Sequence, residues 1–449
     1  MSLPPPIASV LRPALRRLLQ LDQPAPALNE AEFAAEVERH YRWNFAVNLM
    51  DVASFFFGLS FISASTIVPL FISKLSDSPL LIGLAAVIAQ SAWFLPQLFT
   101  ANRVERLARK KPVAVNLGLF LERVPLWVLV GAAVAATHSA PLALVLFFIA
   151  YAWHGLGAGI VATAWQDLIA RCFPVERRGR FFGLSMFIGT GMGALSAALS
   201  TEILAVFPFP TNFVYTFALA AVFISLSWVF LSLAREPVQL ISAPRQSERE
   251  FWAQLPDIPR RDHNFRRFLI ARLLLALGGM GTGFVTVAAV QRWQVADSTV
   301  GVYTAALLLG QTLGNLAFGL LADRLGHKLS LELGAAAACL AFGLAWLAPA
   351  SEWFFAVFAL LGITSGSIVV SGILVVMEFS DPPRRPTYVG MANTGVGLAS
   401  AAAPLLGAVL AGVDYGLLFA SGAIVNLAAL GLMRWWVKEP RWVKEIRHS

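Results

Sequence analysis

Twelve long apolar runs, separated by short polar segments, fill most of this 449-residue chain. Each run is long enough, at about 1.5 Å per residue, to cross a hydrocarbon core about 30 Å thick. Because a backbone in lipid must satisfy its own hydrogen bonds, we expect α-helices. Charged residues make up only 13% of the chain, against about 25% in soluble domains, which disfavours a large soluble protein. The runs lie at 44–73, 79–101, 112–136, 141–168, 180–206, 211–234, 265–294, 298–322, 328–348, 352–379, 386–412 and 415–437.

Lysine and arginine are distributed unevenly among the segments between these runs. Thirty of the 34 lie in the two terminal segments and in alternate loops, whereas the intervening loops hold only Lys74 and Arg292. Positively charged loops stay in the cytoplasm, so the pattern predicts a multi-pass protein of the cell (inner or plasma) membrane with both termini cytoplasmic. The net charge of +8 then reflects membrane topology, and we expect no nucleic-acid partner.

Short patterns recur in the same order in the two halves of the chain. Asn44-Phe45 recurs as Asn264-Phe265, and Asp77-Ser78 recurs as Asp297-Ser298, each 220 residues later. Ordered matches at nearly constant spacing indicate two homologous six-helix halves in parallel orientation. The predicted organisation is a cytosolic N-terminal extension (1–43), a six-helix bundle (44–234), a cytosolic linker (235–264), a second six-helix bundle (265–437) and a cytosolic tail (438–449).

The two cytosolic segments carry weaker signals. In the extension, Asn29 followed by Glu32 predicts a capping box that opens a short amphipathic helix ahead of the first apolar run. In the linker, a short helix is expected over Glu248–Leu255, between prolines. The two cysteines lie in or beside different apolar runs, so no disulfide is expected.

A charged turn, Gly319-Leu-Leu-Ala-Asp323-Arg324-Leu-Gly326-His327-Lys328, joins the eighth and ninth apolar runs. A weaker copy, Ala101-Asn-Arg-Val-Glu105-Arg106-Leu-Ala-Arg-Lys110, joins the second and third runs. Both copies have an acid, an arginine and a leucine at the same spacing, followed by a small residue and basic residues. Such a turn can fix topology by its positive charge alone, or it can provide specific contacts between helices.

Twelve helices as six plus six, a cytosolic linker and this repeated turn resemble the major facilitator superfamily, whose signature is G-x-x-x-D-R-x-G-R-[RK]. The second copy matches at Gly319, Asp323, Arg324, Gly326 and Lys328, and His327 replaces an arginine. The resemblance implies a transporter that rocks its two halves about a central site. It also implies that Asp323 meets the start of the fifth helix, and Glu105 the start of the eleventh, when the cytoplasmic side is closed; Arg106 belongs to the same gating motif.

Ionisable residues within the apolar runs are candidates for function because burying them in lipid is costly. Asp51 lies about two turns into the first run, one turn after Asn48, and Arg272 lies at equivalent depth in the repeat-related seventh run. If both face a central cavity, Asp51 and Arg272 can form an ion pair between the halves. The alternative is that each finds a partner within its own half.

The third and fourth runs supply further candidates. Glu122 and Arg123 are adjacent, and because helical neighbours point about 100° apart they are not obvious partners. Glu122 is either structural or a proton carrier. His154 either titrates or is a core histidine with one satisfied partner. Gln311 and Asn315 in the eighth run either face the cavity or bond between helices.

These observations predict a secondary transporter of a small solute, with protons as the candidate coupling ion. We expect a drug-like compound, a sugar or a metabolite as substrate, a lipid bilayer as surroundings and a monomeric protein. The sequence has no metal-ligand cluster, phosphate-binding loop or nucleophile arrangement, so we expect neither a cofactor nor an enzyme. The alternative is a non-transporting membrane receptor or assembly factor with the same fold.

Overall fold

The computed structural model describes residues 13, 16–23, 28–97, 100, 104, 107–238, 257–372, 374–379 and 385–440. Within them, eleven helices are long and apolar enough to cross a membrane. The expected all-helical membrane fold is confirmed, and α2 is the twelfth expected span, made more polar by Asn48 and Asp51. Glu105, Arg106 and the helix expected at Glu248–Leu255 lie outside the described residues, as does the side chain of Asp323.

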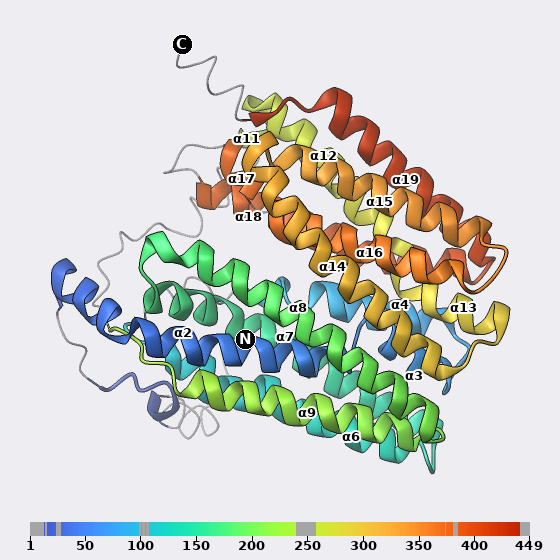
Figure 1. Ribbon diagram of the computed structural model, residues 1–449, viewed down its shortest axis with the longest axis horizontal. Helices are drawn as coiled ribbons and strands as arrows, with labels where there is room; N and C mark the ends of the chain where they lie inside the picture. Colours follow the sequence, from blue (N-terminus) through green and yellow to red (C-terminus); the bar gives the residue numbers. More distant parts are fainter. Residues whose placement is uncertain are drawn as a thin grey trace.

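The helices form two groups, which Figure 1 shows one above the other. The N-terminal group comprises α2 (Glu30–Ser60), α3 (Ile67–Ser73), α4 (Pro79–Ser91), η1 (Val113–Leu117), η2 (Leu119–Arg123), α6 (Val124–Ala135), α7 (Ala140–Cys172), α8 (Val175–Val206) and α9 (Thr211–Ser232). The C-terminal group comprises α11 (Asp257–Arg261), α12 (His263–Gly278), η3 (Gly279–Phe284), α13 (Val285–Trp293), α14 (Asp297–Leu325), α15 (His327–Leu347), α16 (Trp353–Ser371), α17 (Leu374–Phe379), α18 (Arg385–Ala411) and α19 (Tyr415–Trp436).

Helix α2 differs from the predicted first span at both ends. The capping box of Asn29 and Glu32 is present, but the helix that it opens continues without a break for 31 residues to Ser60. The predicted run 44–73 is instead interrupted after Ser60, and α3 resumes at Ile67. Thr66 bonds the Ser63 hydroxyl at 2.7 Å in the interruption, and such local hydroxyl bonds compete with the helical hydrogen-bond ladder.

The seventh span is irregular at the corresponding depth. Between α12 and α13, the segment Gly279–Phe284 is a 3₁₀-helix containing three glycines. The interruption in the first span lies beside this irregular stretch, since the Thr286 hydroxyl donates to the Ser65 carbonyl at 2.8 Å. Two repeat-related irregularities therefore meet between the halves, where short 3₁₀ segments often mark hinges.

Two helix pairs, α8 with α14 and α4 with α18, pack across the boundary between the halves. Gly301 of α14 lies directly on α8: a Cβ atom at this position would be 2.7 Å from Thr201 Cα. Only glycine permits so close an approach, because any side chain would collide with backbone. The α8–α14 contact therefore holds the halves together near the start of α14.

Polar contacts also join the halves at the end of the molecule where α14 begins. The other end, where α2 begins and α19 finishes, is called the terminal end. At the end where α14 begins, Lys74 Nζ lies 2.7 Å from an Asp297 carboxylate oxygen. The hydroxyls of Thr66 and Thr304 lie 2.7 Å apart. These contacts tie the interruption in the first span to the beginning of α14.

At the terminal end, the two halves repeat one contact. Asn44 accepts from the Arg235 backbone N–H at 2.8 Å and donates to the Arg235 carbonyl at 2.9 Å. Asn264 accepts from the Lys438 N–H at 2.9 Å and donates to its carbonyl at 3.0 Å. In each half, the asparagine of the recurring Asn-Phe pair thus fixes the segment that follows the sixth span of that half.

Candidate functional site

A cavity of about 210 Å³ lies within the N-terminal half. It is bounded by α2, the turn after α4, η2, α7, α8 and α9. Its wall combines three ionisable side chains with several aromatic rings, a mixture typical of binding pockets that need orientation as well as apolar contact. The lining residues are Asp51, Val52, Phe55, Phe56, Trp93, Glu122, Arg123, Ala158, Val161, Ala162, Trp165, Met186 and Leu231.

Asp51 lies on the buried face of α2, with 4% of its surface exposed. Its Oδ1 accepts a hydrogen bond from the Ser227 hydroxyl of α9 at 2.6 Å. Asn48, one turn earlier, donates to the Asn44 carbonyl at 2.7 Å, while its Oδ1 is enclosed without a hydrogen-bond partner among the described residues. Asp51 therefore has a neutral donor as its direct partner, and the unsatisfied Asn48 oxygen lies one turn away on the same helix.

Glu122 and Arg123 contact one another, contrary to the expectation from an α-helix. The third span is π-helical over η1 and η2, which end at Arg123. A π-helix closes each hydrogen bond over one more residue than an α-helix, so neighbouring side chains are separated by a smaller angle. Both groups are buried, and their pairing leaves Asp51 as the cavity acid without an ion pair among the described residues.

His154 supports this π-helical stretch from α7. Its Nδ1 lies 2.8 Å from the Glu122 backbone carbonyl, and because a carbonyl only accepts, Nδ1 is the donor. Trp228 of α9 donates similarly to the Val115 carbonyl at 2.8 Å. Both rings satisfy carbonyl groups of the π-helix. His154 is buried behind the cavity wall, and this contact fits the structural alternative for it.

Arg272 does not pair with Asp51 in this structure. The charged groups acting on Asp51 are Arg123 and Glu122 of its own half. Arg272 lies on the buried face of α12, and its Nη2 would be 3.3 Å from a Cβ atom added at Gly372, where α16 has just ended. Equivalent depth in repeated helices therefore did not predict a contact, because each side chain points into its own bundle.

The two candidate residues of α14, Gln311 and Asn315, lie where this helix packs closely on α16. Backbone atoms of Gln311 and Asn315 lie within 3.0 Å of the Cβ positions of Gly362 and Gly366. Both polar atoms of the Asn315 side chain are enclosed and lack a hydrogen-bond partner among the described residues. Asn315 is therefore the stronger of these two candidates for a group that a ligand or water satisfies.

The charged turn between α14 and α15 has a left-handed glycine at its centre. Gly326 has φ +97°, a conformation that favours glycine, and a Cβ atom there would lie 2.7 Å from the Glu439 carboxylate. Lys328 pairs with Glu332 at 2.9 Å. Arg324 is exposed, and no atom lies within 4 Å of a Cβ position at Gly319. The gating contacts expected of Asp323 thus involve atoms outside the described set.

Glu236 and Glu439 were missed by the sequence analysis. They occupy repeated tripeptides, Arg235-Glu236-Pro237 and Lys438-Glu439-Pro440, at the ends of the two halves. Glu236 accepts from the backbone N–H groups of Lys110 and Lys111 at 2.7 and 2.9 Å, where the third span begins. Burial raises the pKa of Glu236 and lowers that of Lys111. The repetition itself was the signal that could have revealed them.

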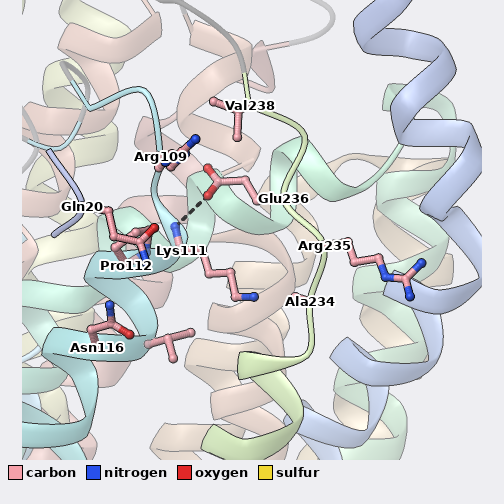
Figure 2. Close-up of a pocket in the computed structure, with 10 residues that line it drawn as sticks. Gln20, Arg109, Lys111, Pro112, Asn116, Ala234, Arg235, Glu236 and Val238 are labelled. Atoms are coloured by element: carbon pink, nitrogen blue, oxygen red, sulfur yellow. Dashed lines mark hydrogen bonds between the residues drawn. The ribbon is translucent and has the colours of Figure 1, made fainter. Parts of the chain in front are cut away.

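Figure 2 shows the cavity at the terminal end that Glu236 helps to form, about 290 Å³ in volume. The Lys111 backbone N–H points at the Glu236 carboxylate, and the Arg235 side chain points away from the other residues that line the cavity. Asn116 donates to the Leu18 carbonyl at 2.7 Å, which attaches the N-terminal segment here. The arrangement joins the extension, the start of the third span and the linker.

Comparisons with known proteins agree with this architecture. A family model described as Major Facilitator Superfamily matches residues 268–447. A stretch of 176 residues is 32% identical to the 3-(3-hydroxy-phenyl)propionate transporter of Escherichia coli, covering 38% of this chain and 42% of that protein. A stretch of 159 residues is 30% identical to the 4-hydroxybenzoate transporter PcaK of Pseudomonas aeruginosa, covering 34% and 35%. The chain thus matches less than half the length of these relatives.

In three dimensions the likeness extends over most of the chain. The crystal structure of a D323A mutant of the nucleoside transporter NupG aligns over 88% of this chain and 100% of its own, with a TM-score of 0.67 at 14% identity. This fold and the eleven apolar helices of the described residues define a multi-pass membrane protein. Its C-terminal half matches the Major Facilitator Superfamily in sequence, and most of the chain shares the fold of that solved structure.

Proposed function

We propose that this protein carries a small organic solute across the cell membrane by alternating access. The observation that carries the proposal is the N-terminal cavity, about 210 Å³ in volume, which places Asp51, Glu122 and Arg123 among aromatic rings inside a membrane fold. Buried charges of this kind are costly and are retained for function. A receptor or assembly factor with the same fold has no comparable need for them, which favours transport over that alternative.

Aromatic acids are the substrate class that we favour. Both curated relatives carry aromatic acids by name, the hydroxyphenylpropionate and the hydroxybenzoate transporters. The cavity offers Phe55, Phe56, Trp93 and Trp165 as apolar surfaces, and aromatic side chains pack well against a flat ring by offset or edge contacts. A solute of one ring and a short acidic chain matches both observations.

Protons are the coupling ion that we favour, with Asp51 as the carrier. Glu122 already contacts Arg123, whereas Asp51 has the neutral Ser227 hydroxyl as its direct partner. A buried carboxylate without a cationic partner is stabilised by taking up a proton. Loading and release of that proton at the two membrane faces would link solute movement to the proton gradient.

The terminal end is the cytoplasmic end in this proposal, because the positively charged loops lie there. The contacts of Lys74 with Asp297 and of Thr66 with Thr304 then close the outer side. In a chain without its native cysteines, Glu250→Cys should react with an impermeant thiol reagent only after the cells are opened. Labelling in intact cells would contradict this orientation.

Transport by the wild-type protein tests the proposed function. Purified protein in liposomes should exchange external radiolabelled 4-hydroxybenzoate or 3-hydroxyphenylpropionate for internal unlabelled solute, and should accumulate it under an inward proton gradient. Liposomes without protein provide the baseline. Exchange without gradient-driven accumulation would reject proton coupling. Failure of a broad panel of acids, sugars and nucleosides to exchange would support the receptor or assembly role.

A further inference from the structure

Arg272 differs from the other buried cations of this protein in its surroundings. It has 7% of its surface accessible. Among the described residues, its guanidinium has no hydrogen-bond partner and no carboxylate within ion-pair distance, although it is buried. By contrast, Arg123 contacts Glu122, and Lys328 lies 2.9 Å from Glu332.

An unpaired guanidinium in this position is energetically unfavourable. A charged group removed from water raises the free energy of the folded state unless an opposite charge or a set of hydrogen bonds compensates for it. Arginine cannot escape the cost by losing its proton, as a lysine or histidine can. The described residues supply no such compensation, and the small accessible fraction of Arg272 leaves a way for a ligand to reach it.

Gly372 lies directly against the guanidinium. Helix α16 ends at Ser371, and Gly372 is its C-cap residue. A Cβ atom at Gly372 would be 3.3 Å from Arg272 Nη2. A glycine next to a planar guanidinium allows a flat ligand group to approach, and a carboxylate can accept two parallel N–H bonds from it.

We propose that Arg272 binds the carboxylate of an organic monoanion during transport. This inference rests on the proposed transport function and assigns the anion to the C-terminal half. A single positive charge balances one carboxylate, whereas a phosphate dianion would remain uncompensated. Asp51, in the N-terminal half, is then free to carry the proton, so that the loaded protein gains an anion and a proton together.

Binding by purified full-length protein tests this assignment. The probes are 4-hydroxybenzoate and its neutral analogue 4-hydroxybenzamide, and the readouts are calorimetry and ligand-induced thermal shift. Wild-type protein should prefer the acid. Arg272→Gln should weaken binding of the acid by about thirtyfold or more, since removing one partner of a buried charge pair costs at least about 2 kcal/mol. Arg272→Lys should retain part of the preference.

The control is Arg266→Gln, at an exposed arginine on the same helix. This variant should bind both probes as the wild type does.

A second readout excludes misfolding: without ligand, Arg272→Gln should unfold at the same or a higher temperature than wild type, because an uncompensated charge has been removed. Wild-type affinity for the acid in Arg272→Gln would overturn the assignment. A wild-type protein that exchanges only neutral or cationic solutes would also overturn it, yet leave the transport function intact, whereas absence of all exchange would reject the transport function itself.

Discussion

The buried polar side chains of this protein serve two purposes. Some satisfy backbone groups that an irregular helix leaves unpaired, as His154 and Trp228 do for the third span. Others, such as Asp51 and Arg272, satisfy no backbone group among the described residues and lie beside a cavity or a helix break. The first kind should affect stability when replaced, and the second kind should affect binding or transport.

His154→Phe should lower stability without altering the pH dependence of transport. The substitution removes the hydrogen bond that His154 donates to the buried Glu122 carbonyl, which costs about 0.5–1.5 kcal/mol. Unfolding in detergent, followed by tryptophan fluorescence, measures the loss. His138→Phe, at an exposed position, is the matched control and should be close to neutral. If instead His154→Phe is stable and its transport no longer depends on pH, the histidine is a proton carrier.

At the scale of helices, the ends of the spans are fixed by groups far away in sequence. Glu236 follows the sixth span, yet it accepts from the N–H groups that begin the third. Glu439 follows the twelfth span and lies against Gly326, where the ninth begins. Because the first N–H groups of a helix have no partner within it, an acid there acts as a cap and also favours the helix dipole.

Glu236→Ala should therefore destabilise the N-terminal half by about 0.5–2 kcal/mol, the usual cost of losing a helix cap. Glu38→Ala removes an acid from an exposed pair with Arg177 and should cost little. Thermal unfolding of both variants under the same detergent conditions compares them. Equal losses of stability in the two variants would show that the net charge of the terminal end, and not the helix cap, determines its stability.

The sequence predicted the helices well and their mutual contacts poorly. Apolar runs determine where spans occur, and Asn29 with Glu32 predicted a capping box because its groups are local. The π-helix that brings Glu122 to Arg123 was not predictable, since rings from α7 and α9 satisfy its carbonyls. The expected ion pair of Asp51 and Arg272 is absent in this structure for a similar reason: depth along a helix does not define which bundle a side chain faces.

On the scale of the whole molecule, alternating access requires the contacts between the halves to separate. The Thr66 and Thr304 hydroxyls lie 2.7 Å apart across that boundary. In a chain without its native cysteines, Thr66→Cys with Thr304→Cys should form a disulfide on oxidation and arrest transport, and a reductant should restore it. Each single variant should transport under both conditions. Full transport by the cross-linked protein would mean that this boundary does not open.

The central claim is that a buried carboxylate in the N-terminal cavity couples a proton to solute movement, and Asp51→Asn tests it most directly. Asparagine can still bond Ser227 but cannot release a proton. In liposomes, the variant should exchange labelled for unlabelled aromatic acid at a rate similar to wild type, yet fail to accumulate it under a proton gradient. Accumulation equal to wild type at matched protein density would contradict the account and leave Glu122 as the next candidate for the proton site.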